Sequence, residues 1–140
     1  MYKLFTPSQA TDLIGVVDLM LRDLQGALKD VQRLQRERAG LRSDSLRAQQ
    51  LNAELAFIVE SAKLTKGELD RLGVLVKDLE QGIVDFPGKL GAEVVYLCWA
   101  QGEDAVTHYH TLSQEAGARQ QLPPGSLEPG PQTDMPVARA

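Results

Sequence analysis

Aromatic residues are scarce in this sequence, at 5% of its 140 residues. The core of a β-sandwich usually draws on aromatic and β-branched side chains, so this scarcity disfavours such a fold. Hydrophobic residues nevertheless make up 43% of the chain. The core must therefore be built mainly from Leu, Val and Ala, which favours the packing of helices.

Cysteine is almost absent as well, since Cys98 is the only one and no intramolecular disulfide can form. The reducing cytoplasm is the simplest setting for such a chain. Residues 1–12 contain no apolar segment typical of a secretory signal. There is also no run of about 18 apolar residues, so no transmembrane helix is expected. We therefore expect a cytoplasmic protein without a membrane partner.

A capping box opens the first predicted helix, which covers about residues 7–39. Thr6 can cap this helix, Pro7 suits its first position and Gln9 completes the box. Apolar residues then recur at alternating steps of four and three, which is the heptad pattern of a coiled coil. The positions are Leu13, Val17, Met20, Leu24, Ala27, Val31 and Leu34.

A second helix is predicted over about residues 44–81, after a turn at residues 39–44 that contains Gly40. Its seam keeps the same alternation, and only Thr65 departs from apolar character. The positions are Leu51, Leu55, Ile58, Ala62, Thr65, Leu69, Leu72, Val76, Leu79 and Ile83. Because the connection is short, the two helices should form an antiparallel, coiled-coil-like hairpin.

A small sheet over about residues 83–112 should follow the hairpin. Three segments favour strands, at residues 83–86, 94–99 and 106–111, and turn residues separate them. We expect a three-stranded antiparallel meander packed at the base of the hairpin, where extra apolar residues need cover. The alternative makes residues 104–116 a short helix.

The predicted fold is therefore α+β, mainly α, with one domain over residues 1–117. Residues 118–140 contain five of the seven prolines, together with glycine and serine. Such a segment cannot bury enough apolar surface to offset the entropy of ordering. A disordered tail is predicted there.

Cys98, His108 and His110 are candidate metal ligands. If the last two strands pair across the turn at Gly102, Cys98 lies opposite His108, and Tyr96 lies opposite His110, all on one face. Cysteine and histidine suit zinc, with Asp85 or Glu103 as a fourth ligand. The spacing matches no known zinc signature, so a buried cysteine with two half-exposed imidazoles is favoured, and no cofactor is expected.

Asp85, Glu103 and His110 are candidate catalytic residues. Asp85 lies among apolar neighbours and could serve as a general base paired with Glu103 or His110. Alternatively, it caps a turn or holds a basic partner, Lys89 or Arg119. The sequence has no glycine-rich phosphate loop and no serine nucleophile elbow. It therefore does not establish an enzyme and favours a protein that is not one.

The predicted hairpin tip is basic, although the whole chain has a net charge of −4. Residues 29–47 contain six Lys and Arg against three Asp and Glu. Such a tip could contact nucleic acid or an acidic partner. The candidate contact residues are Arg33, Arg36, Arg38 and Arg42. No aromatic residue is interleaved for base stacking, so a solvated tip is favoured.

Residues 82–87 and 95–99 stand out in the second half of the chain, together with Gly102, Glu103, His110, Gly117 and Arg119, and with Phe5 and Thr6 at the start. In these residues the chain resembles a bacterial family catalogued as domain of unknown function 2203, of which some members are loosely labelled division-initiation proteins. The family pattern tends to have Trp at the position of Tyr109 and does not require His108. The resemblance implies a bacterial cytoplasmic protein but no activity, substrate or cofactor.

Three hypotheses for function follow. The first is a structural or protein-interaction role, with the hairpin as a homodimer in a four-helix bundle or docked on another protein. The second is a nucleic-acid-associated factor that uses the basic tip. The third is a small metal-binding protein or enzyme that uses the sheet residues. The first rests on apolar residues that a lone hairpin would leave exposed: Leu46, Leu51, Leu55, Phe57 and Val59.

Overall fold

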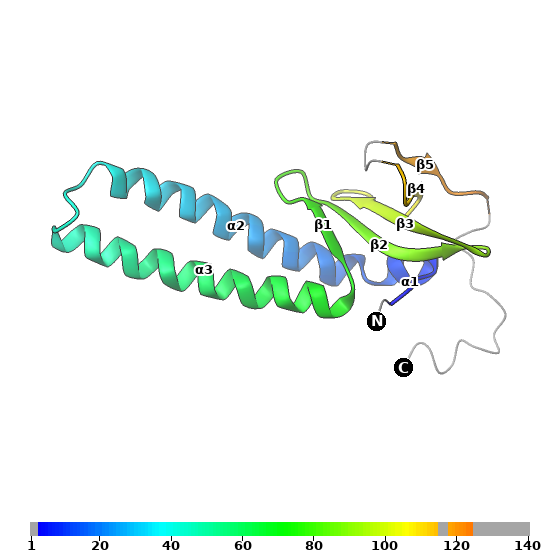
Figure 1. Ribbon diagram of the computed structural model, residues 1–140, viewed down its shortest axis with the longest axis horizontal. Helices are drawn as coiled ribbons and strands as arrows, with labels where there is room; N and C mark the ends of the chain where they lie inside the picture. Colours follow the sequence, from blue (N-terminus) through cyan, green and yellow to red (C-terminus); the bar gives the residue numbers. More distant parts are fainter. Residues whose placement is uncertain (1–2, 115–117, 125–140) are drawn as a thin grey trace. The chain divides into compact units, whose positions relative to one another are not determined.

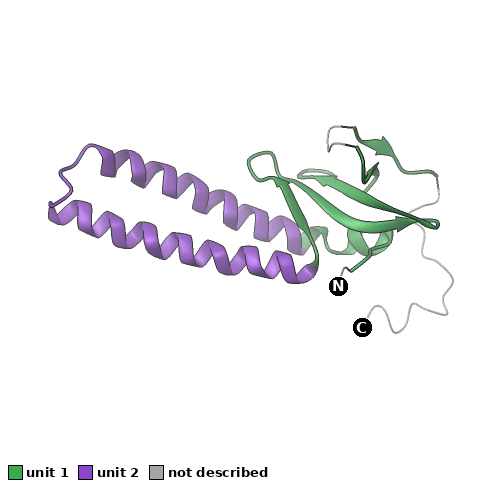
Figure 2. Ribbon diagram, viewed as in Figure 1, with its two compact units in different colours: residues 1–15, 73–140 green, residues 16–72 purple. Residues whose placement is uncertain are grey.

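The computed structural model describes residues 3–114 and 118–124 (Figure 1). Its chain divides into two compact units, one over residues 16–72 and one from residues 1–15 with residues 73–140 (Figure 2). The first unit is a pair of long helices, and the second contains an antiparallel sheet. The predicted α+β fold, mainly α, is confirmed. Among the described residues, no helix is both long and apolar enough to cross a membrane.

The hairpin consists of α2 (Ile14–Ala39) and α3 (Leu46–Leu72). Their inward positions are the predicted apolar seam, whose members on α3 are buried or half-buried as far as Leu72. The fully buried residues are Val17, Leu21, Leu24 and Leu34 on α2, and Ala48, Leu51 and Leu69 on α3. The antiparallel helical hairpin is therefore confirmed.

Polar pairs between the two helices fix their register. The hydroxyl of Thr65 donates to the Asp23 carboxylate at 2.8 Å, and Arg38 Nε donates to the Asn52 side chain at 3.0 Å. Both pairs are centred on the turn, as antiparallel helices require. Ser45 caps α3, since its hydroxyl accepts from the Ala48 N–H at 3.1 Å.

The predicted first helix is divided at Leu13 into α1 (Pro7–Asp12) and α2. The capping box is confirmed, because the side chain and backbone of Thr6 each form a hydrogen bond with Gln9. Within the sheet unit, the Val106 N–H donates to the Thr11 hydroxyl at 3.0 Å. This contact holds the last turn of α1 within the sheet unit.

The second helix ends at Leu72, so the predicted end near residue 81 is wrong. Gly73 has φ +87°, a left-handed conformation that ends helices and that glycine adopts without strain. The chain then enters β1 (Leu75–Asp78), so the last part of the predicted helix is instead a strand and a turn. A second left-handed residue, Gly82 at φ +72°, closes that turn.

The sheet has five strands in the described residues, in the order β1-β2-β3-β4-β5, and all neighbours are antiparallel. The three predicted strands are present as β2 (Ile83–Leu90), β3 (Glu93–Ala100) and β4 (His108–Thr111). The alternative of a helix at residues 104–116 is wrong for the part that forms β4. The predicted number of strands is also wrong, because β1 and β5 add one strand at each edge.

The last strand, β5 (Gln120–Gln121), lies inside the segment predicted to be disordered. It pairs with β4, with Tyr109 opposite Gln120 and His108 opposite Gln121. The prediction of disorder is therefore wrong at this point, while residues 125–140 lie outside the described part of the chain. The single-domain boundary at residue 117 and the packing of the sheet on the hairpin base remain predictions.

One face of the sheet forms the core of its unit. Phe86 is fully buried there and meets Phe5 edge to face, with ring centroids 5.3 Å apart. The backbone of Phe5 accepts from the Lys89 N–H at 3.1 Å and donates to the Pro87 carbonyl at 2.8 Å. This close approach needs Gly88, because a Cβ there would lie 2.6 Å from the Phe5 carbonyl oxygen.

We expect Gly88→Ala to lower the free energy of unfolding by about 1–3 kcal/mol, since the new methyl group forces a shift in a packed region. Urea denaturation followed by circular dichroism measures the change. Gly26→Ala is the matched control, since a Cβ at Gly26 meets nothing within 4 Å on α2. That variant should instead gain about 0.5–1 kcal/mol. Equal effects of the two substitutions would contradict the close approach at Gly88.

Candidate functional site

The other face of the sheet holds most of the titratable residues singled out in the sequence. Asp85 on β2 is opposite Cys98 on β3, and Cys98 is opposite His108 on β4. Tyr96 is opposite His110 in the same ladder. The predicted pairings of Cys98 with His108 and of Tyr96 with His110 are therefore confirmed. We call Asp85, Cys98, Glu103, His110 and Arg119 the sheet cluster.

Asp85 and His110 form a buried pair. The Asp85 Oδ2 atom lies 2.9 Å from His110 Nε2, and the two side chains are 0% and 3% exposed. The other ring nitrogen of His110, Nδ1, lies 3.2 Å from the backbone carbonyl oxygen of Thr111. A carbonyl oxygen only accepts, so Nδ1 carries a hydrogen and donates it. The contact with Asp85 then requires a further proton between Nε2 and Oδ2.

The pair is therefore neutral as a unit, whether the shared proton lies on the imidazole or on the carboxyl group. Such a pair can in principle transfer a proton, as the sequence suggested for Asp85 and His110. However, both side chains are almost inaccessible, and a general acid or base must reach its substrate within hydrogen-bond distance. The geometry favours a structural role.

Cys98 is a buried free thiol. Burial raises the pKa of the Cys98 thiol to about 11, the Arg119 guanidinium opposes this shift, and the Asp85 carboxylate adds to it. The thiol therefore remains protonated near pH 7, whereas a nucleophile or a zinc ligand must be a thiolate. The environment of Cys98 disfavours both roles.

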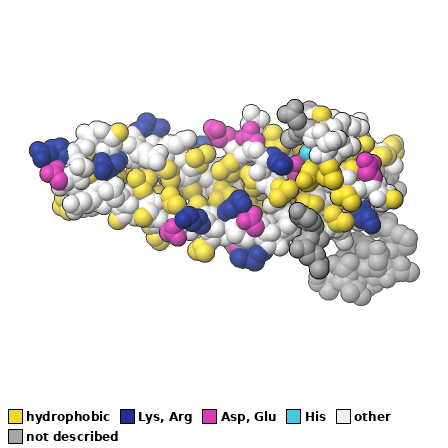
Figure 3. Space-filling view, viewed as in Figure 1, with side chains coloured by type: hydrophobic (Ala, Val, Ile, Leu, Met, Phe, Trp, Pro, Cys, Tyr) yellow, Lys and Arg dark blue, Asp and Glu magenta, His cyan; other side chains and the backbone are white. Residues whose placement is uncertain are grey.

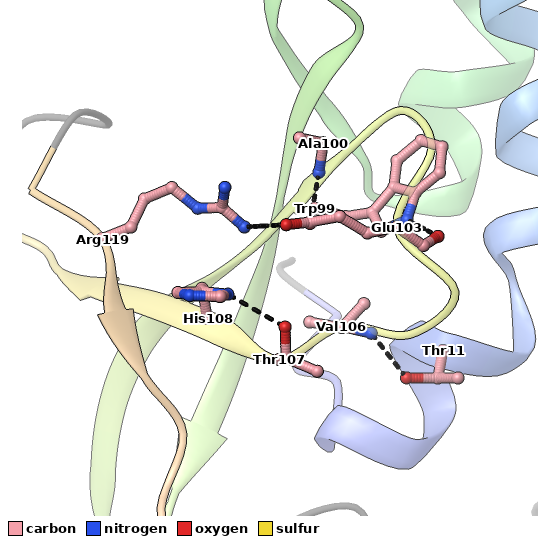
Figure 4. A network of polar contacts seen from close by, with 8 residues as sticks. All are labelled: Thr11, Trp99, Ala100, Glu103, Val106, Thr107, His108 and Arg119. Carbon is pink, nitrogen blue, oxygen red and sulfur yellow. Dashed lines mark hydrogen bonds and ion pairs between the residues drawn. The ribbon is translucent and has the colours of Figure 1, made fainter.

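Glu103 organises the turn between β3 and β4 (Figure 4). Its carboxylate accepts from the Ala100 N–H and from Arg119 Nη2, each at 2.9 Å, and its carbonyl accepts from the Trp99 indole at 2.8 Å. Glu103 is thus a partner of Arg119 and not of Asp85. The sequence analysis considered Arg119 only as a possible partner of Asp85. Its pairing with Glu103 was missed because residue 119 was assigned to the disordered tail.

The candidate metal ligands are not gathered into a site. His108 Nδ1 lies 2.9 Å from the Thr107 hydroxyl (Figure 4), and His110 pairs with Asp85. Over residues 3–114 and 118–124, no group of three or more His, Cys, Asp and Glu is placed to hold a metal ion. Cys98, His108 and His110 share a face of the sheet without forming a ligand set.

Some of the basic residues at the tip have partners within the hairpin. Arg33 lies 3.3 Å from Asp30, and Arg42 lies 3.0 Å from Asp44. Arg38 donates a hydrogen bond to the Asn52 side chain, as described above. Arg36 lies in the last turn of α2. Nearby, the hydrogen bond from Arg47, at 2.8 Å, lowers the pKa of the Glu37 carboxyl. These partners weaken the case for a nucleic-acid site.

The outer side of α3 carries large exposed apolar side chains. Leu46, Phe57 and Leu64 are 71%, 73% and 73% exposed. Beside Phe57 lies a shallow depression lined by Ala53, Glu54, Phe57 and Ile58. Figure 3 shows hydrophobic side chains among charged ones along the hairpin. We call Leu46, Ala53, Phe57 and Leu64 the α3 stripe.

The prediction that a lone hairpin leaves five apolar residues exposed is wrong for two of them. Leu51 is fully buried and Leu55 is half-buried, because both belong to the seam that faces α2. The heptad pattern places both on that seam, but it cannot show how completely a single partner helix covers them. Val59 is 40% exposed, as expected from the sequence, although it lies off the stripe.

A family model described as "Uncharacterized conserved protein (DUF2203)" matches residues 3–122. The match includes both helices of the hairpin and all five strands. No curated protein and no solved structure matches the chain.

We expect His110→Ala to lower the free energy of unfolding by about 3–5 kcal/mol at neutral pH, because it leaves the Asp85 carboxylate buried without its partner. The double variant Asp85→Ala with His110→Ala should cost less than the two single variants together, since it removes both members. Urea denaturation of all four proteins measures the coupling. Strictly additive single effects would contradict an energetically coupled pair.

We also expect Cys98 to react slowly with a thiol reagent at pH 8 in the folded protein and rapidly in urea, because the thiolate is the reactive form. The same pKa predicts a loss of stability as pH rises from about 9 towards about 11, since the thiol ionises first in the unfolded chain. Cys98→Ala should lack that part of the loss. Fast labelling of the folded protein would contradict the burial.

Proposed function

Because this chain belongs to the family described as uncharacterized conserved protein DUF2203, whose description names no activity, we propose a function from the molecule's own surface. The protein is a protein-interaction module that acts through its helical hairpin and associates with itself as a homodimer. Its setting is the cytoplasm, where Cys98 remains a free thiol.

The observation that carries this proposal is the α3 stripe. Single exposed apolar residues are normal on a protein surface and need no explanation. Here, three large ones lie on the same side of one helix, and each is more than 70% exposed. Burying such a side chain fully is worth about 1.5–3 kcal/mol, so a partner that covers the stripe gains appreciable free energy.

A second copy of the hairpin can bury the α3 stripe. Two hairpins that pack through one helix each form a four-helix bundle, and a two-fold axis uses the same surface on both copies. The apolar seam within each hairpin remains intact in this arrangement, because the stripe and the seam use different sides of α3. A different protein docked on the stripe is the alternative occupant.

Nucleic-acid binding through Arg33, Arg36, Arg38 and Arg42 is the weaker alternative. Arg33 and Arg42 already have acidic partners, and Arg38 donates to an amide oxygen, which reduces the positive charge and the N–H donors available to phosphates. An enzyme or metal protein that uses the sheet cluster is weaker still, given the burial of Asp85, Cys98 and His110.

We expect sedimentation velocity at micromolar to submillimolar concentration to show a dimer that dissociates on dilution. Phe57→Glu should shift the protein to the 15.3 kDa monomer over the same range, because a charge would have to be buried in the interface. The matched control is Ala56→Glu, which adds the same charge to an exposed neighbouring position off the stripe. It should leave the dimer largely intact.

Salt separates this proposal from its alternatives. Association through apolar side chains should persist at high salt, whereas contacts between arginines and an anionic partner weaken steeply. A monomer at every concentration, with Phe57→Glu indistinguishable from the parent protein, would contradict self-association. Retention of RNA or DNA at low salt, lost on neutralising the four arginines, would favour the nucleic-acid alternative.

A further inference from the structure

We infer that the α3 helices of two copies pair antiparallel about a two-fold axis that passes beside residue 55. This inference rests on the self-association proposed above and adds the geometry of the contact. It identifies the occupant of the α3 stripe as the same stripe on a second copy of this chain.

The spacing of the α3 stripe is symmetric. Leu46, Ala53, Phe57 and Leu64 are separated by seven, four and seven residues, so the pattern reads the same in both directions from position 55. When two copies run antiparallel with position 55 at the centre, Leu46 of each meets Leu64 of the other. Likewise, Ala53 of each meets Phe57 of the other.

The four residues also lie on one line of the helix. At about 100° per residue, all four fall within roughly 20° of a common direction. The fully buried Leu51 and Leu69 point about 140° away from that direction on the same projection. The stripe therefore faces away from α2 and is available to a second helix.

Side-chain size agrees with the antiparallel register. The small Ala53 lies opposite the large Phe57, so each phenyl ring has room where the other copy has only a methyl group. The depression lined by Ala53, Glu54, Phe57 and Ile58 is where that ring would lie. A parallel pair would instead set Phe57 against Phe57 and leave a gap between the two alanines, and packed interfaces tolerate neither well.

The polar residues beside the stripe fit the same register. Gln50 and Glu60 are symmetric about position 55, so the antiparallel register sets an uncharged amide, and not a second carboxylate, at the level of each Glu60. The symmetric basic residues, Arg47 and Lys63, project about 100° from the stripe, outside the contact. Each also has an acidic partner in its own copy, at 2.8 Å and 3.0 Å respectively.

The contact is expected to be reversible. Stable interfaces bury about 800 Å² on each partner, and four side chains along five turns of one helix supply less than that. An association that is complete only at high protein concentration is therefore the expected behaviour, and crosslinking suits it better than isolation of an intact dimer.

The test mixes two variants, Leu46→Cys and Leu64→Cys, one of them isotope-labelled, and treats the mixture with a short bismaleimide. The antiparallel register predicts a mixed product, which joins one variant to the other, several-fold above either product of like chains. The parent protein, with only buried Cys98, is the control and should not crosslink. Circular dichroism confirms that both variants keep the helical content of the parent.

The outcomes separate the register from the proposed function. Like-with-like products in excess, Leu46→Cys with itself and Leu64→Cys with itself, would overturn the antiparallel register while self-association stands. Near-equal amounts of all products would overturn a defined register. No crosslinking, together with a monomer in sedimentation at every concentration, would overturn the register and the self-association together.

Discussion

The left-handed conformation of Gly73 is the constraint on which the arrangement of this chain depends. At φ +87° the backbone leaves α3, which ends at Leu72, and then enters β1 at Leu75. A residue with a side chain is strained in this conformation, whereas glycine adopts it without steric cost. The residues that follow Gly73 form β1, which pairs with β2 at the sheet edge.

The sequence pattern therefore predicts most of the hairpin but not its end. Val76 and Leu79 satisfy the heptad alternation as well as they suit a short strand and turn, so periodicity cannot distinguish the two. What decides is a backbone angle at Gly73 that the pattern does not contain. β5 was missed for a related reason: two exposed glutamines carry no strand signal of their own, and pairing with β4 decides their conformation.

The candidate site was predictable where it depended on strand register. The turn at Gly102 and the alternation of strand side chains were enough to set Cys98 opposite His108. Partner choice was harder, because it depends on which groups the fold buries together. His110 joins Asp85 in the interior, while Glu103 joins Arg119 at the turn, and sequence spacing alone left these combinations open.

The two sides of α3 carry separate sets of apolar residues, which separates internal packing from external contact. The seam toward α2 repeats every seven residues, or 3.5 per turn, which suits helices that coil around each other. In the α3 stripe, Leu46 and Leu64 lie 18 positions apart, which is five turns at 3.6 residues per turn. A set of that period stays on a straight line along a straight helix. Such a line suits contact with another straight segment over a few turns, and a second copy of α3 offers the same line reversed.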